Sequence, residues 1–226
     1  PFTHMGMSFD VSEFLPSDSL GLTLYAVNGW DSYIDNTEGK SFGAYLTYAP
    51  SDDFFASLAL IHGPEAFPNQ SESDNTMMYN VVLTYSLPQV DRLSLGYDWN
   101  HGYMEDRKTN GHAGVAGGNV ANSGIGASGA HWWATAGYAM IDFTDNQMGA
   151  LRYEYYNDED GAKGFDYSLW TITYTHNITV ADNLMIRPEI RHNNYNVQEA
   201  KELTHGDKGN TFDNETIIGV GVEYIF

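Results

Sequence analysis

The sequence lacks cysteine altogether and is poor in basic residues. None of its 226 residues is a cysteine, which excludes disulfide scaffolds, thiol catalysis and cysteine-ligated zinc. The 10 Lys and Arg residues face 30 Asp and Glu residues, giving a net charge of −20. Because binding to duplex nucleic acid needs cations that displace counterions from phosphate, this balance argues against a nucleic-acid partner. It also disfavours attraction to anionic lipid headgroups through surface charge alone.

Long apolar runs are missing as well. The mean hydropathy is −0.39, and no apolar stretch reaches the roughly 18–20 residues that a membrane-spanning helix needs. The sequence does have 16 Tyr, 23 Gly and only 18% charged residues, a composition that favours strands and turns over soluble helices. A β-barrel crosses a membrane with alternating residues, so a low mean hydropathy does not exclude a membrane location.

Apolar and polar residues alternate with a period of two from one end of the chain to the other. This pattern is typical of strands with one apolar face. About eleven segments show it: Met5–Val11, Leu20–Ala26, Phe42–Tyr48, Phe54–Leu60, Met77–Tyr85, Leu93–Trp99, Trp132–Met140, Leu151–Tyr155, Trp170–Tyr174, Leu184–Arg191 and Ile218–Phe226.

The connections between these segments alternate in length. Short connections lie at 14–18, 50–53, 87–91, 144–146 and 180–183, and long ones at 28–41, 62–75, 101–129, 157–166 and 193–214. This order places turns at one rim of the sheet and loops at the other, as in an outer-membrane barrel with short periplasmic turns and long external loops. A Greek-key sandwich has no reason to sort its connections in this way. The pattern predicts one antiparallel up-and-down transmembrane β-barrel over residues 1–226.

The polar members of the alternating rows indicate which face is which. They are small residues or long side chains that can form ion pairs, and Lys is nearly absent from them. A lumen suits such residues, whereas a soluble barrel would expose a face rich in Lys and Glu. We therefore expect the apolar rows to face lipid, with aromatic girdles near the strand ends. The girdle candidates are Tyr25, Tyr48, Tyr79, Tyr85, Tyr97, Trp99, Trp132, Tyr153, Tyr155, Trp170 and Tyr224. The alternative is the core of a soluble sandwich.

The end of the chain carries a further signal. Tyr224 and Phe226 close an alternating apolar strand, which resembles the C-terminal signal that bacterial outer-membrane barrels present to the barrel-assembly machinery. The segments Pro1–Gly6, Val27–Asp31, Ile186–Arg191 and Thr216–Val222 are similar to the β-barrel porin-2 family. The resemblance implies a bacterial outer-membrane porin without catalytic residues.

Members of that family are longer at the N-terminus, which bears on the strand count. Single-chain bacterial barrels have an even number of strands with both termini on the periplasmic side. About eleven strands is one short of parity. We therefore expect at least one further strand upstream of Pro1, giving a barrel of 12 or more strands.

Seven charged residues are predicted to line the pore. Arg152 and Glu154 share a strand face, and an isolated charge facing lipid at the midplane would cost about 2–4 kcal/mol. Opposed acids and bases at a constriction set a field that selects permeants; the alternative is a lumen plugged by salt bridges. The full set is Asp98, Arg152, Glu154, Arg187, Glu189, Arg191 and Glu223.

No motif with fixed spacing points to a cofactor, a metal or an enzyme. The eight His residues show no pair at helical metal-binding spacing. His101, Asp106, His112, Ser128 and His131 cluster around one long connection, but such residues are common in loops. We expect no catalytic site, no cofactor and no metal.

The function most consistent with this pattern is passive diffusion of small hydrophilic solutes through a bacterial outer-membrane porin. Acidic residues of the long loops predict a negative vestibule that prefers cations. The alternative is a closed structural or adhesive barrel that binds a partner through these loops, and the oligomeric state stays open. The loop acids are Asp31, Asp35, Glu38, Glu65, Glu72, Asp74, Glu105, Asp106, Asp158, Glu159, Asp160, Glu199, Glu202, Asp207 and Asp213.

Overall fold

The chain is built from strands, as its alternation predicts. The computed structural model describes residues 4–29, 37, 39–65, 74–88, 90, 92–105, 129–158, 162, 167–197 and 214–224. The strands are β1 (Gly6–Asp10), β2 (Leu20–Val27), β3 (Ser41–Ser51), β4 (Phe54–Glu65), β5 (Asp74–Ser86), β6 (Leu93–Met104), β7 (Ala130–Thr144), β8 (Gln147–Asn157), β9 (Tyr167–Ala181), β10 (Leu184–Val197) and β11 (Asn214–Tyr224). A short 3₁₀ helix, η1 (Ser12–Phe14), follows β1. Within the described residues, no helix is long and apolar enough to cross a membrane.

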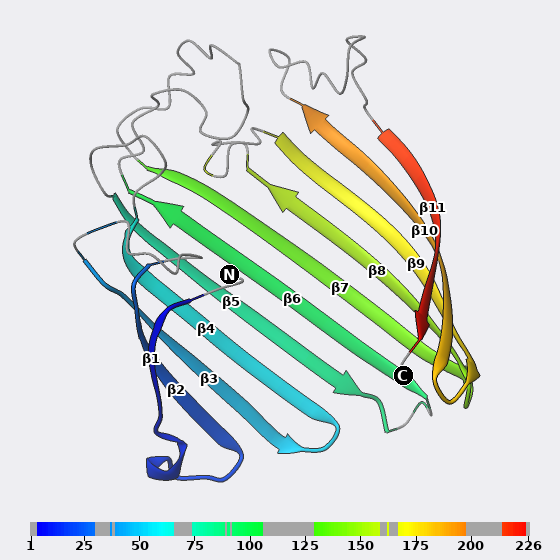
Figure 1. The fold of residues 1–226 in the computed structure, drawn as a ribbon, viewed down its shortest axis with the longest axis horizontal. Helices are drawn as coiled ribbons and strands as arrows, with labels where there is room; N and C mark the ends of the chain where they lie inside the picture. The colour runs from blue at the N-terminus through cyan, green and yellow to red at the C-terminus, as the bar shows by residue number, and fades with distance from the viewer. Residues whose placement is uncertain are drawn as a thin grey trace.

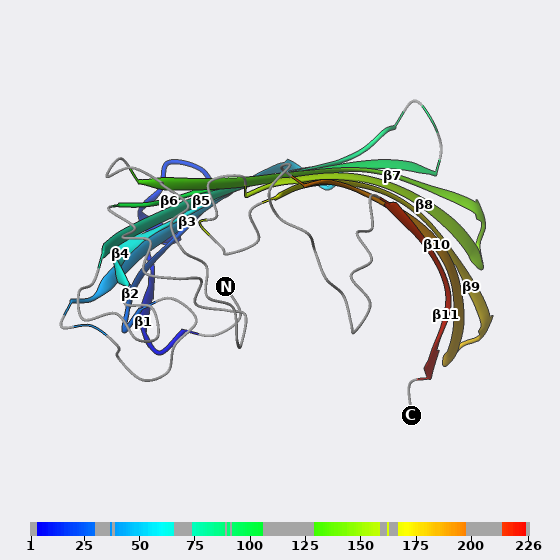
Figure 2. The same cartoon turned by 90° about the horizontal axis from the view of Figure 1, so that it is seen from above.

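All eleven strands form one antiparallel sheet in sequence order, from β1 to β11. Figure 1 shows them side by side as a meander, and Figure 2 shows that the sheet curves through a wide arc. The up-and-down topology expected from the connections is therefore confirmed. β1 and β11 are the two edges of the sheet, and no register pairs them with each other in the part of the chain that is described.

The short connections lie together at one end of the sheet and are built from residues that suit turns. Two-residue turns at 52–53, 145–146 and 182–183 consist of Asp and Asn, whose side chains can bond to the nearby backbone. The connection between β1 and β2 is longer and holds η1. There, the Ser12 backbone N–H donates to Asp10 Oδ1 at 2.9 Å, and the Leu22 backbone N–H donates to Ser12 Oγ at 2.9 Å.

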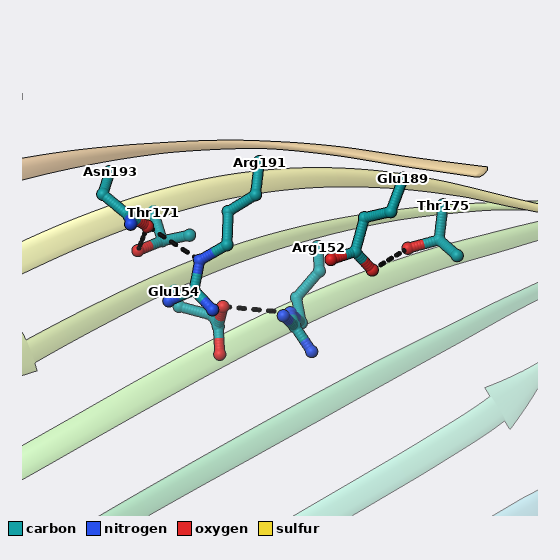
Figure 3. Close-up of polar contacts among 7 residues, drawn as sticks. All are labelled: Arg152, Glu154, Thr171, Thr175, Glu189, Arg191 and Asn193. Carbon is teal, nitrogen blue, oxygen red and sulfur yellow. Dashed lines mark hydrogen bonds and ion pairs between the residues drawn. The ribbon is translucent and has the colours of Figure 1, made fainter. Parts of the chain in front are cut away.

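The two faces of the sheet differ in polarity. One row of directly paired residues, Leu83, Tyr97, Gly137, Tyr153 and Ile172, runs across β5–β9 and is almost entirely apolar. Large apolar side chains on this face are strongly exposed, up to 77% at Ile218 on β11. The opposite face carries the charged side chains drawn in Figure 3 and lies on the inside of the arc. We call these the convex and the concave face.

One strand does not follow the faces expected from its sequence. On β7 the row containing Trp132 and Tyr138 was expected to face lipid, but Tyr138 pairs with Arg152 and Trp132 is 4% exposed on the concave face. Tyr25 pairs with Gly43 on the same face, so neither Tyr25 nor Trp132 belongs to a girdle. The physical reason on β7 is that its second row, with Trp133 and Ile141, is equally apolar. Polarity alone therefore does not fix the orientation of β7.

Candidate polar wall on the concave face

The charged side chains of β8–β11 form one continuous polar surface. Cross-strand pairing places Arg152, Thr173 and Arg191 in one row of the sheet. The next row toward the long loops contains Glu154, Thr171 and Asn193. Because the side chains of a strand alternate between faces, residues two apart on β8 or β10 project to the same side. Figure 3 shows the charged side chains of both rows, together with Thr171 and Asn193, on one face of the sheet.

The centre of this wall is an ion pair within one strand. Arg152 Nε lies 2.9 Å from Glu154 Oε2, and both side chains are 32% exposed. The two atoms are close, but their angle is not that of a hydrogen bond. The contact is therefore a half-buried ion pair, held on β8 by residues two apart.

Arg191 belongs to a hydrogen-bond network that reaches β11. Its Nε donates to Asn193 Oδ1 at 2.7 Å, and Thr171 Oγ1 donates to the same oxygen at 3.0 Å. Asn193 Nδ2 in turn donates to Glu215 Oε1 at 2.7 Å. Tyr195 Oη also donates to Glu215 Oε1 at 2.7 Å. The Asn193 amide and the Glu215 carboxylate thus connect β9, β10 and β11.

The wall continues toward the short turns with three more charged groups. Thr175 Oγ1 donates to Glu189 Oε2 at 2.8 Å. Arg187 Nε donates to Asn177 Oδ1 at 2.8 Å, while Arg187 Nη2 lies 3.6 Å from Glu223 Oε2. The Arg187–Glu223 pair is more exposed than the pair on β8.

A hollow opens at the loop side of the ion pair. It has a volume of about 320 Å³, and charged residues of both signs line it: Asp98 from β6, Glu154 from β8 and Arg191 from β10. Asn80 Nδ2 donates to Asp98 Oδ1 at 2.6 Å. Asn100 adds a neutral polar group, and apolar or aromatic side chains such as Leu169 and Tyr156 line other parts of the hollow. The hollow therefore offers hydrogen-bond donors and acceptors together with both signs of charge.

Above the hollow, near the long loops, the concave face becomes apolar. Met104, Ala130 and Trp132 form a buried cluster with Ala162, which lies in the connection between β8 and β9. Tyr156 on β8 packs against this cluster. The β8–β9 connection thus touches the concave face at Ala162.

Comparison with known proteins agrees with this architecture. The family model described as "Putative beta-barrel porin-2, OmpL-like" matches residues 1–226. The chain belongs to this family. No curated protein matches the chain. The family match covers every strand, so the polar wall of β8–β11 lies within the porin-2 domain.

In this porin-2 chain, all seven charged residues expected to line a pore are among the described residues. Registers and side-chain contacts bring them to one face: Arg152 pairs with Thr173, Glu189 with Thr175 and Arg187 with Gly221. Leu151, beside Arg152, is on the other face and pairs with Tyr174. Of the two residues of the terminal signal, Tyr224 pairs with Leu184 on the convex face, and Phe226 lies outside the described residues.

Sequence reasoning missed two neutral members of the porin-2 polar wall. Asn193 and Tyr195 orient the charges but carry none themselves. The signal that finds them is simple. Asn193 and Tyr195 continue the every-second-residue series that begins at Arg187 on β10.

Of the residues considered for catalysis or metal binding around the β6–β7 connection, His101 and His131 are among the described residues. His131 Nδ1 lies 3.3 Å from His101 Nε2 on the convex face, beside Tyr103. Asp106, His112 and Ser128 lie outside the described residues. In the described segments, no three His, Asp or Glu side chains are grouped so that they could hold a metal ion.

Proposed function

We infer that this protein is a bacterial outer-membrane channel for passive diffusion of small hydrophilic solutes. The observation that carries this inference is the segregation of charge. Arg152, Glu154, Arg187, Glu189 and Arg191 share the concave face, whereas the convex face exposes apolar side chains. A charged side chain facing lipid costs about 2–4 kcal/mol at the midplane, while a water-filled lumen accepts it. The porin description of the family supports the same function, and we propose no catalytic role.

The proposed channel requires that the sheet close. Unpaired backbone groups are too costly to leave in hydrocarbon, so β1 and β11 must each find a partner. Bacterial barrels have even strand numbers, so one further strand upstream of Pro1, pairing with both edges, would satisfy this need with the fewest additions. Tyr224, 57% exposed on the convex face, and Phe226 would then serve as the signal for the barrel-assembly machinery.

The channel is also proposed to prefer cations. On the concave face of β6–β11, six carboxylates outnumber three guanidinium groups, with the carboxylates belonging to Asp98, Asp142, Glu154, Glu189, Glu215 and Glu223. Most of the loop acids expected to form a negative vestibule lie outside the described residues; of those inside, Glu105 is exposed, whereas Glu65 and Asp158 are buried. The preference should fall as salt rises, because the Debye length shrinks from about 10 Å at 0.1 M to about 3 Å at 1 M.

Planar-bilayer recording of the complete protein tests these proposals. Steady ohmic steps are the expected result, and reversal potentials under a KCl gradient should show cation preference that declines with salt. Folded protein that gives no conductance would overturn the channel and favour a closed barrel that binds a partner. Anion preference that persists at low salt would show that Arg152, Arg187 and Arg191 dominate the field. Circular dichroism of the same protein preparation in liposomes would establish that the protein is folded.

A further inference from the structure

Opposite charges alternate along the concave face of β10. Arg187, Glu189 and Arg191 occupy every second position, so successive charged residues are about 6–7 Å apart along the strand. The glycines of β11 lie opposite this series, with Gly221 paired to Arg187 and Gly219 paired to Glu189. A side chain built at Gly219 would meet nothing within 4 Å. The charged series therefore borders open space on its β11 side.

Glu189 and Arg191 are held by neutral neighbours and not by each other. Thr175 donates to Glu189, and Arg191 donates to Asn193. Among the described residues, neither makes an ion pair. Arg152 and Glu154, with the same two-residue spacing, do form one. In a lumen plugged by salt bridges, adjacent opposite charges would be more stable as ion pairs, because unpaired charges in a poorly hydrated lumen are costly.

The hollow beside Arg191 also brings opposite charges close together, here from different strands. Arg191 faces it from β10, and Asp98 faces it from β6. Asp98 accepts a hydrogen bond from the neutral amide of Asn80, so its negative charge is not neutralised there. Glu154 adds a second carboxylate that is already paired with Arg152. A solute in this hollow meets a guanidinium on one side and carboxylates on the other.

We propose that this wall is a path for zwitterionic solutes the size of amino acids and dipeptides. The inference rests on the proposed channel and names its solute class. The carboxylate of the solute would contact Arg191, and its ammonium would contact Glu189 or Asp98. The ends of an extended dipeptide are about 6–7 Å apart, which matches the step between charges on β10. Weak, repeated sites of this kind favour entry without trapping the solute.

Swelling of liposomes that contain the complete protein provides the test. Three uncharged or net-neutral solutes are compared at equal osmolarity: arabinose, glycylglycine and N-acetylglycinamide. The last two are similar in size, but only glycylglycine is a zwitterion. Glycylglycine should enter about two- to fivefold faster than N-acetylglycinamide, the ratio that one solvent-exposed ion pair supports.

The variants Glu189→Gln and Arg191→Gln, alone and together, should remove this advantage when each rate is divided by the rate of arabinose entry through the same variant. Arg92→Gln is the matched control, because Arg92 lies in the turn between β5 and β6 and pairs with Asp145. It should leave the advantage intact. Failure of arabinose to enter the unaltered protein would overturn the channel itself. Arabinose entry with equal rates for the two matched solutes, or a double variant that slows both equally, would overturn the zwitterion path alone.

Discussion

The two halves of the concave face are built differently, although they belong to one sheet. A single row of paired residues shows it. On β2–β5 the row reads Gly21, Thr47, Ser57 and Val82, and on β6–β10 it continues as Asp98, Ala136, Glu154, Thr171 and Asn193. In the described part of β1–β5, the charged groups of the concave face lie near the strand ends, at Asp10 and Glu65.

This difference shows that charge on the concave face is not spread to make a uniformly wet surface. It is gathered on β6–β11, where neutral Thr and Asn residues orient it. The other half offers small or uncharged side chains. At Gly43 there is no room for a larger residue, because an added Cβ would lie 2.8 Å from the Leu60 carbonyl oxygen. In the proposed channel, the charged wall of β6–β11 would supply the electrostatic field and the uncharged wall of β1–β5 would leave space for the solute. The following predictions test that division.

The largest effect is expected where a charge is moved from one face of β8 to the other. Leu151→Arg would place a cation on the convex face, and Ala150→Arg, one residue away, would place it on the concave face beside Thr175. The first variant should lose about 2–4 kcal/mol of unfolding free energy in lipid, and the second far less. Urea unfolding in liposomes measures both. Equal losses would show that the convex face of β8 does not contact hydrocarbon.

The neighbouring rows explain which parts of this architecture are readable from sequence. On β8 and β10 the charged residues recur at every second position, so the face of each strand is fixed before any register is known. On β7 both rows are largely apolar and each contains a tryptophan, Trp132 or Trp133, so the face depends on pairing with β6 and β8. Which charges form ion pairs is harder still to predict from the sequence. Arg152–Glu154 and Glu189–Arg191 have the same spacing, and the difference arises from Thr175 and Asn193, which only the register and side-chain contacts bring into place.

An intermediate effect is expected when either half of the concave face is made more negative by one unit of charge. Arg191→Gln removes a cation from the charged wall, and Thr47→Glu adds an anion to the uncharged wall, so both change the net charge by the same amount. Arg191→Gln should raise the K⁺/Cl⁻ permeability ratio about twofold, in line with one weakly screened site. Thr47→Glu should change it clearly less, because permeant ions follow the charged wall. Reversal potentials under a KCl gradient measure the permeability ratio of each variant. A larger change for Thr47→Glu would contradict the proposed difference between the charged and the uncharged wall.

The smallest effect concerns how tightly the charged wall is held together. Arg152 and Glu154 are 2.9 Å apart and about one third exposed, whereas Arg187 and Glu223 are 3.6 Å apart with 47% and 57% exposure. Exposed ion pairs contribute about 0.2–1 kcal/mol, and salt weakens them. Double-mutant cycles with Gln replacements should therefore give a coupling free energy near the top of that range for the first pair and near the bottom for the second.

The measurement is unfolding in liposomes at low and at high salt. The half-buried pair should lose a smaller fraction of its coupling as salt rises, because solvent ions reach it less easily. If the more exposed pair proved the stronger, the stability of the wall would lie in its edge at β11 and not in its centre at β8.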